Sequence, residues 1–195
     1  AASNPGARPT VTFVEEAGRQ IDVIKRHGRL SDMIAVARPD RDRNLGENTL
    51  KAALFHSGRP VLMCPPAKTP PKVLGARIAP AWNGSAEAAR ALAQSRNALI
   101  EADRVWVLTN GADAGPGTGV EDLVAYLAMH GIAAEVVPFK AKSKIGVELL
   151  KTSMGLGADM LVMGAYGDSH ERETVFGGNT QQVVDGAEIP VLLSH

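Results

Sequence analysis

Residues 159–164 read Asp-Met-Leu-Val-Met-Gly and residues 32–37 read Asp-Met-Ile-Ala-Val-Ala, so one segment of the chain occurs twice. Each copy continues with a polar loop, a helical stretch and a second apolar run, Arg-Pro-Val-Leu-Met at 59–63 and Ile-Pro-Val-Leu-Leu at 189–193. Short apolar runs separated by helical segments are typical of parallel strands that are covered on both faces. The repeat therefore predicts an α/β protein built from two related units.

The two copies differ in the loop between the strand and the helix. This loop is four residues longer in the second copy, where it also contains Gly164 and Gly167. Glycine lets a backbone approach a ligand closely because it has no side chain. We therefore expect a ligand loop in the second copy. The first copy has Ala37 in place of Gly164 and is expected to bind nothing.

Residues 72–195 alternate between apolar strands and helices through a complete unit. This alternation predicts a five-stranded, parallel, doubly wound sheet of the Rossmann-like type. The expected strands are residues 77–82, 104–108, 133–139, 160–163 and 190–193.

Residues 1–64 supply only the second half of such a unit, and they are separated from the rest by a linker. Four prolines in residues 65–71 exclude a helix or a central strand there. The strands expected in the half-unit are residues 10–14, 33–36 and 60–63. Because it lacks two strands, it should expose a sheet edge unless a partner covers it. Alternatively the chain is a clipped piece of a longer protein, which the absence of an initial Met favours.

Composition limits the classes of partner. The net charge is +0 at pH 7, so there is no basic footprint of the kind that binds nucleic acid. No apolar run reaches the roughly 18 residues that span a bilayer. The only cysteine, Cys64, fits a reducing compartment. We expect a cytoplasmic protein without nucleic-acid or membrane partners.

The glycine-containing loop lies where open parallel sheets bind ligands, beyond the carboxyl end of a strand. It runs from Gly164 to a helix that begins near Asn179. Unpaired amides at a helix start suit phosphate oxygens, and Gly177 and Gly178 would leave them uncovered. Asn179 and Thr180 would either contact the phosphates or cap the helix. From these residues alone, a phosphate site and an ordinary turn with a helix cap are equally compatible.

The spacing of the loop glycines resembles the nucleotide loop of the universal stress protein family. Gly164-x-x-Gly167 is followed, after nine residues, by Gly177. Three further segments resemble the same family, namely the first strand-to-helix turn, the fourth strand with its loop and the closing strand (residues 82–90, 158–167 and 190–193). The resemblance covers residues 72–195, and the half-unit resembles the end of a degenerate first copy in tandem members.

The resemblance implies an adenine nucleotide alpha hydrolase-like fold, homodimers and a role in stress response. In some members ATP or a related adenine nucleotide binds, with Mg²⁺ where a carboxylate is available to hold it, whereas in others the loop is altered and no nucleotide is held. Many members have Asp where this chain has Asn83, which removes one such carboxylate. Gly164, Gly167, Gly177 and Gly178 would line the phosphates, and Met163 and the end of the first strand, Ala81 to Asn83, would lie near the ribose and base.

The sequence offers no sign of efficient catalysis. The five histidines have no metal-ligand spacing, and no nucleophile with an adjacent base stands out. We expect nucleotide binding with at most slow ATP hydrolysis. An alternative is a nucleotide-free interaction module whose closing strand pairs with another copy. The acidic loop residues and the hydroxyl-free Gly178 favour this alternative, whereas the intact glycine spacing favours the nucleotide (the acidic residues are Asp168, Glu171 and Glu173).

Overall fold

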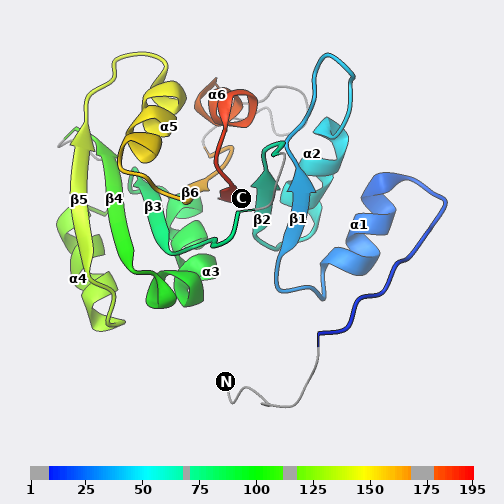
Figure 1. The fold of residues 1–195 in the computed structure, drawn as a ribbon, viewed down its shortest axis with the longest axis horizontal. Coiled ribbons are helices and arrows are strands. Elements are labelled where there is room, and N and C mark those ends of the chain that lie inside the picture. The colour runs from blue at the N-terminus through cyan, green and yellow to red at the C-terminus, as the bar shows by residue number, and fades with distance from the viewer. Residues whose placement is uncertain (1–8, 68–70, 112–117, 168–177) are drawn as a thin grey trace.

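The computed structural model of the protein describes residues 9–67, 71–111, 118–167 and 178–195. These residues form a seven-stranded sheet with helices on both faces (Figure 1). The strands are β1 (Ile34–Ala37), β2 (Val61–Cys64), β3 (Arg77–Trp82), β4 (Arg104–Asn110), β5 (Ala134–Phe139), β6 (Met160–Gly164) and β7 (Val191–Ser194). The helices are α1 (Gln20–Gly28), α2 (Glu47–His56), α3 (Ala86–Glu101), α4 (Val120–Met129), α5 (Ile145–Gly155) and α6 (Gly178–Gly186). The predicted α/β class is confirmed.

The second unit is a five-stranded parallel sheet, as predicted, and its strands lie in the order β7-β6-β3-β4-β5. The chain runs outward from β3 to β5 and then returns to the other side of β3 with β6 and β7. Helices α3 and α4 pack against one face, and α5 and α6 against the other. The connections therefore diverge between β3 and β6, which is where a doubly wound sheet binds its ligand.

Strand β3 is central although it contains Pro80. Proline is rare in central strands because it has no N–H to donate to a neighbour. On one side, the pairing with β4 includes Ile78 and resumes at Ala81, so it is interrupted around Pro80. On the other side, Pro80 still pairs with Val162 of β6. The contact between β3 and β6, which frames the divergence point, is thus kept.

The half-unit and the second unit pair their last two strands in the same register. Ile34 of β1 lies beside Val61 of β2, and Leu161 of β6 lies beside Val191 of β7. These are the residues that the sequence repeat aligns. The repeated sequence therefore produces a repeated local structure.

Strands β2 and β7 pair antiparallel and join the two units into one sheet (Figure 1). Leu62 of β2 lies opposite Leu192, its equivalent in β7, so the two copies are related by an approximate two-fold axis. The outer edge of β7 is occupied by β2. The expectation that this closing edge pairs with another copy of the chain is therefore wrong.

The strand expected at residues 10–14 does not form. This segment is extended but unpaired with any described strand, and Val11 and Phe13 are 95% and 89% exposed. In the second unit, the equivalent strand β5 pairs only with β4. The described part of the half-unit contains no counterpart of β4, so this segment lacks the neighbour that would order it. Within the described residues, β1 pairs only with β2 and ends the sheet.

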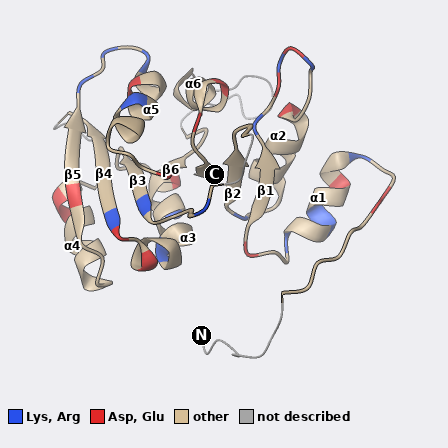
Figure 2. Cartoon of the chain, in the orientation of Figure 1, with Lys and Arg blue, Asp and Glu red and all other residues tan. Residues whose placement is uncertain are grey.

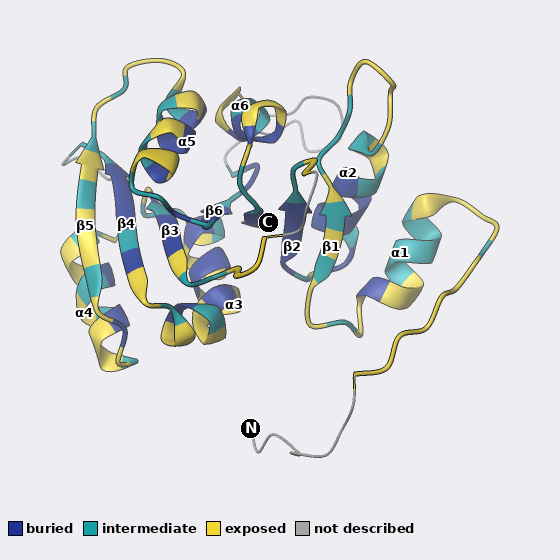
Figure 3. Ribbon diagram, viewed as in Figure 1, coloured by how far each residue is buried: buried dark blue, intermediate teal, exposed yellow. Residues whose placement is uncertain are grey.

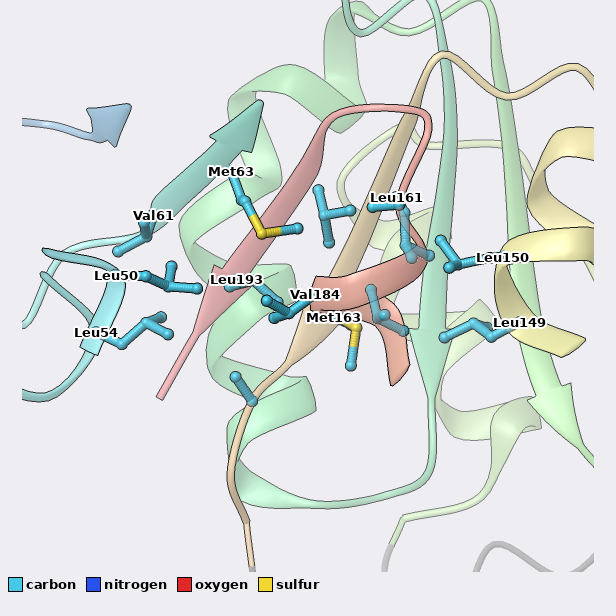
Figure 4. Packing of buried hydrophobic residues seen from close by; sticks show 14 of the residues in the cluster. Leu50, Leu54, Val61, Met63, Leu149, Leu150, Leu161, Met163, Val184 and Leu193 are labelled. Carbon is cyan, nitrogen blue, oxygen red and sulfur yellow. The ribbon is translucent and has the colours of Figure 1, made fainter. Parts of the chain in front are cut away.

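The core on the α2, α5 and α6 side continues across the boundary between the units (Figures 3 and 4). Leu50 and Leu54 of α2 pack in the same cluster as Leu161 and Leu193 of the second unit. Burying one such side chain is worth about 1.5–3 kcal/mol. The two units therefore share one hydrophobic core.

Two surface properties bear on partners. Acidic and basic residues are interspersed over the described elements, and neither sign gathers on one of them (Figure 2). Among the described residues, every helix is too short or too polar to cross a membrane.

Candidate functional site

A cavity of about 300 Å³ opens at the carboxyl ends of β3, β4 and β6, at the divergence point of the sheet. The first turns of α3, α5 and α6 border it, through Ala88, Gly146 and Gly178 respectively. Helix starts carry unpaired amides and a partial positive charge. Trp82 and Phe139, which end β3 and β5, add aromatic surface. The N–H groups of Ala88 and Gly146 already donate to Ser85 Oγ and Gln182 Oε1. The site therefore combines the helix start at Gly178 with apolar surface.

Most of the residues that the sequence placed at a nucleotide line this cavity. They are Ala81, Asn83, Met163, Gly164, Gly167, Gly178, Asn179 and Thr180. The ninth, Gly177, lies outside the described residues, as do the acidic residues Asp168, Glu171 and Glu173. Residues from both ends of the second unit are therefore brought together at one place.

Gly164 is required by packing, which differs from the reason expected. A Cβ at this position would lie 2.5 Å from the backbone nitrogen of Ala88 and 2.6 Å from the carbonyl carbon of Glu87. The end of β6 is thus in close contact with the first turn of α3. In the half-unit, the equivalent Ala37 is exposed, so a methyl group is accommodated there. The difference between Gly164 and Ala37 follows from the neighbouring helix.

Gly167 and Gly178 leave room for a ligand. A Cβ on Gly178 would meet no atom of the described residues within 4 Å, and this residue is exposed at the start of α6. A Cβ on Gly167 would lie 3.1 Å from Oε2 of Glu87, the end of a flexible side chain. These two positions, more than Gly164, leave backbone accessible from the cavity.

Two of the polar site residues hold the local backbone. Asn83 Oδ1 accepts a hydrogen bond from the N–H of Ser85 at 3.2 Å, and Ser85 Oγ accepts one from the N–H of Ala88 at 3.2 Å. Thr180 is buried, and its Oγ1 accepts a hydrogen bond from the N–H of Tyr166 at 3.3 Å. Asn83 therefore shapes the turn before α3, and Thr180 ties the loop after β6 to α6.

Tyr166 lines the cavity in an unusual backbone conformation. Its φ is 57°, in the left-handed region that few non-glycine residues occupy. Burial, with smaller contributions from the charges of Glu47 and Asp185, raises the pKa of the Tyr166 phenol above its usual value. The ring is therefore neutral at physiological pH.

Glu87 and Asn110 also line the cavity, although the sequence did not predict them as site residues. Glu87 is half-buried in the first turn of α3 and is the only charged side chain among the described residues that line the cavity. Asn110 hydrogen-bonds both the N–H and the carbonyl oxygen of Ala141, at 2.8 and 3.0 Å, and so fixes the connection after β5. Both have a sequence signal, because Glu87 follows the cap residue Ser85 and Asn110 follows a buried strand.

The described part of the cavity contains no obvious catalytic group. Across the described residues, no three His, Cys, Asp or Glu side chains gather closely enough to hold a metal ion. Glu87 could contribute one carboxylate to a divalent cation that arrives with a ligand. The arrangement suits binding of a small molecule that has an apolar part.

Residues 85–195, more than half of the chain, match the model of the universal stress protein family. This range includes α3, the loop after β6 and β7, and therefore most of the cavity. No curated protein matches the sequence.

Solved structures share the fold at low sequence identity. A universal stress protein from Archaeoglobus fulgidus DSM 4304 superposes with a TM-score of 0.70 and 16% identity, over 89% of this chain and 64% of that chain. A putative universal stress protein from Pseudomonas aeruginosa UCBPP-PA14 superposes with a TM-score of 0.57 and 18% identity, over 92% of this chain and 69% of that chain. The hypothetical protein MJ0577 superposes with a TM-score of 0.52 and 18% identity, over 63% of this chain and 96% of that chain. The present chain thus spans less than two thirds of the archaeal universal stress protein.

Proposed function

Because the chain belongs to the universal stress protein family, we propose that it is a cytoplasmic stress-response protein that binds an adenine nucleotide in its second unit. The ligand is ATP or a related adenine nucleotide, and it occupies the cavity beyond β3 and β6. Phosphate oxygens would face the start of α6 and the loop after β6. The base and ribose would face the side of Ala81, Asn83 and Met163.

The observation that supports this proposal most is the open position of Gly178. Its backbone lies at the start of α6, beside the cavity, and no atom in the part of the chain that the structure describes comes within 4 Å of the place of a Cβ. A helix start with an accessible glycine is a common phosphate site. The cavity volume of about 300 Å³ is at the lower end of the range of small-molecule sites.

Glu87 argues for a role of Mg²⁺ in this binding. Its carboxylate lies beside Gly167, where phosphates would approach, and the described residues of the cavity include no Lys, Arg or His. A divalent cation would offset the repulsion between this carboxylate and a polyphosphate. We expect ATP to bind more tightly with Mg²⁺ than without it.

Calorimetry with ATP, in the presence and absence of Mg²⁺, tests the proposal. Gly178→Val should weaken binding strongly, because the side chain would fill the open space at the start of α6. Gly155→Val is the matched control, since Gly155 is also a helix-end glycine with nothing within 4 Å and is absent from the cavity. The proposal would be refuted if millimolar nucleotide with Mg²⁺ produced no heat of binding and no shift in the melting temperature.

One observation still supports the alternative of a nucleotide-free interaction module. Among the described residues that line the cavity, the only charged side chain is the carboxylate of Glu87. A homodimer would have to use a surface other than the edge of β7, since β2 occupies that edge. Sedimentation of the wild type and of Gly178→Val separates the two ideas. If the oligomeric state is the same with and without nucleotide, and the same in wild type and Gly178→Val, the interaction module would be favoured.

A further inference from the structure

The half-unit contacts the loop that follows β6. The ring of Phe55, on α2, lies 5.3 Å from the ring of Tyr166, measured between centroids. The same ring lies edge-on to His195, with centroids 4.7 Å apart, and Nδ1 of His195 lies 3.0 Å from the carbonyl oxygen of Ala165. Ring pairs at these distances attract each other beyond their buried area. Phe55 of the half-unit thus contacts the rings of both Tyr166 and His195, which lie beside the start of the loop that follows β6.

Tyr166 needs such support to keep its conformation. A φ of 57° is uncommon for a residue with a side chain, and contacts around Tyr166 help to maintain it. The second unit contributes the hydrogen bond from the Tyr166 N–H to Thr180 Oγ1. Phe55 contributes the contact with the ring. Without Phe55, we expect the backbone at Tyr166 to sample other conformations.

The half-unit also holds the far end of α6, whose first residues border the cavity. Nη1 of Arg38 donates hydrogen bonds to the carbonyl oxygens of Asp185 and Ala187, at 2.9 and 3.0 Å. Nε of Arg41 lies 3.1 Å from a carboxylate oxygen of Asp185. The last carbonyl groups of a helix lack partners within the helix, and a cation there is favourable. Helix α6 thus has its first turn at the cavity and its last turn on the half-unit.

We propose that the half-unit is a working part of the ligand site, with Phe55 positioning Tyr166 and Arg38 positioning α6. Ligand occupancy and the docking of the half-unit are then coupled. The proposal rests on the proposed function only for the identity of the ligand, because the positioning itself exists without one. By thermodynamic reciprocity, if the docked half-unit raises the affinity of the cavity for its ligand, then the bound ligand must stabilise the docking of the half-unit by the same free energy.

Hydrogen exchange of the ligand-free protein tests the positioning directly. Phe55→Ala should speed amide exchange about tenfold at residues 165–167 and in the first turn of α6. Phe55→Tyr keeps the ring and should restore slow exchange. Tyr126→Ala is the matched control, because Tyr126 is also half-buried and paired with a ring, that of His130, but lies outside the cavity. Unchanged exchange in folded Phe55→Ala would overturn the proposal.

The coupling is tested with ATP and Mg²⁺ on the same variants. Phe55→Ala should bind about tenfold more weakly than wild type, and Phe55→Tyr and Tyr126→Ala should bind as wild type does. ATP should also slow exchange throughout α2, none of whose residues lines the cavity. Protection confined to the cavity elements, or equal affinity of Phe55→Ala and wild type, would contradict the coupling.

The two proposals fail in distinguishable ways. If wild type binds no ATP but Phe55→Ala loosens residues 165–167, the nucleotide assignment is wrong and the positioning stands. If wild type binds ATP and Phe55→Ala changes neither exchange nor affinity, the positioning is wrong and the nucleotide assignment stands.

Discussion

Leu62 and Leu192 lie opposite each other in the antiparallel pair of β2 and β7, and each is the other's equivalent in the sequence repeat. Both are 5% exposed and belong to the core cluster on the α3 and α4 side of the sheet. The boundary between the units is therefore buried on this face as well as on the face of α2, α5 and α6. We expect the two units to unfold together.

Leu62→Ala should destabilise the whole chain by about 2–5 kcal/mol, because it leaves a cavity at the boundary between the units. Urea unfolding, followed by circular dichroism, should give one transition with a lowered midpoint. Leu30→Ala serves as control, since Leu30 is 92% exposed and its loss should change stability by less than about 0.5 kcal/mol. Two separate transitions, with only one shifted, would contradict a shared core.

Gly164→Ala should destabilise the fold by about 1–3 kcal/mol even without ligand, because the new Cβ would overlap the backbone of α3. Gly178→Ala, at a position with open space, should change the melting temperature little. Thermal unfolding of both variants provides the comparison. A fully stable Gly164→Ala protein with weakened nucleotide binding would restore the original interpretation of this glycine as a ligand residue.

Glu87→Gln should strengthen ATP binding about fivefold in the absence of Mg²⁺, because it removes a negative charge beside the expected phosphate position. Affinity for adenosine, which carries no charge, should stay the same. Glu121→Gln controls for the loss of an acidic residue from a first helical turn, since Glu121 holds the same position in α4 and is absent from the cavity. Weaker ATP binding by Glu87→Gln would instead identify this carboxylate as a ligand contact.

Arg38→Gln should cost about 1–3 kcal/mol of unfolding free energy, because the last carbonyl groups of α6 lose two charge-assisted hydrogen bonds. Arg43→Gln is the control, since Arg43 is exposed and its pairing with Asp40 across 3.6 Å is of the kind worth about 0–1 kcal/mol. Chemical denaturation of the two variants measures the difference. Equal stability would show that the Arg38 contacts are dispensable.

Alkaline pH should destabilise the protein through Tyr166. Burial raises the pKa of this phenol in the folded state, so above the unfolded value of about 10 the folded state keeps a proton that the unfolded state loses. Unfolding free energy therefore falls as pH rises beyond that value. Unfolding of wild type and Tyr166→Phe between about pH 9 and pH 11, about one unit either side of that value, measures this dependence. The dependence should be shallower in the variant, and identical slopes would exclude Tyr166 as its source.

The sequence predicted the second unit well because its strands are continuous apolar runs between helices. β3 matches the expected residues 77–82 at both ends, despite Pro80. Strands buried on both faces leave a strong signal in a single sequence. The location of the cavity followed from the same pattern, since the carboxyl ends of parallel strands meet at one edge.

Other features depend on contacts between segments far apart in the chain. Residues 10–14 have an apolar strand pattern, yet they form no strand, and no strand among the described residues pairs with them. The packing reason for Gly164 depends on α3, and the contact of Glu87 with the cavity depends on how that helix approaches β6. Neither the contact of Gly164 with α3 nor that of Glu87 with the cavity can be read from the neighbouring residues in the sequence.

The pairing of β2 with β7 has a consequence for behaviour at low concentration. A strand edge that is covered by a separate molecule becomes uncovered on dilution, because the complex dissociates. Here the covering strand is tethered to the strand it protects, at an effective concentration that does not depend on how much protein is present. The protein can therefore keep this edge covered even when it is scarce.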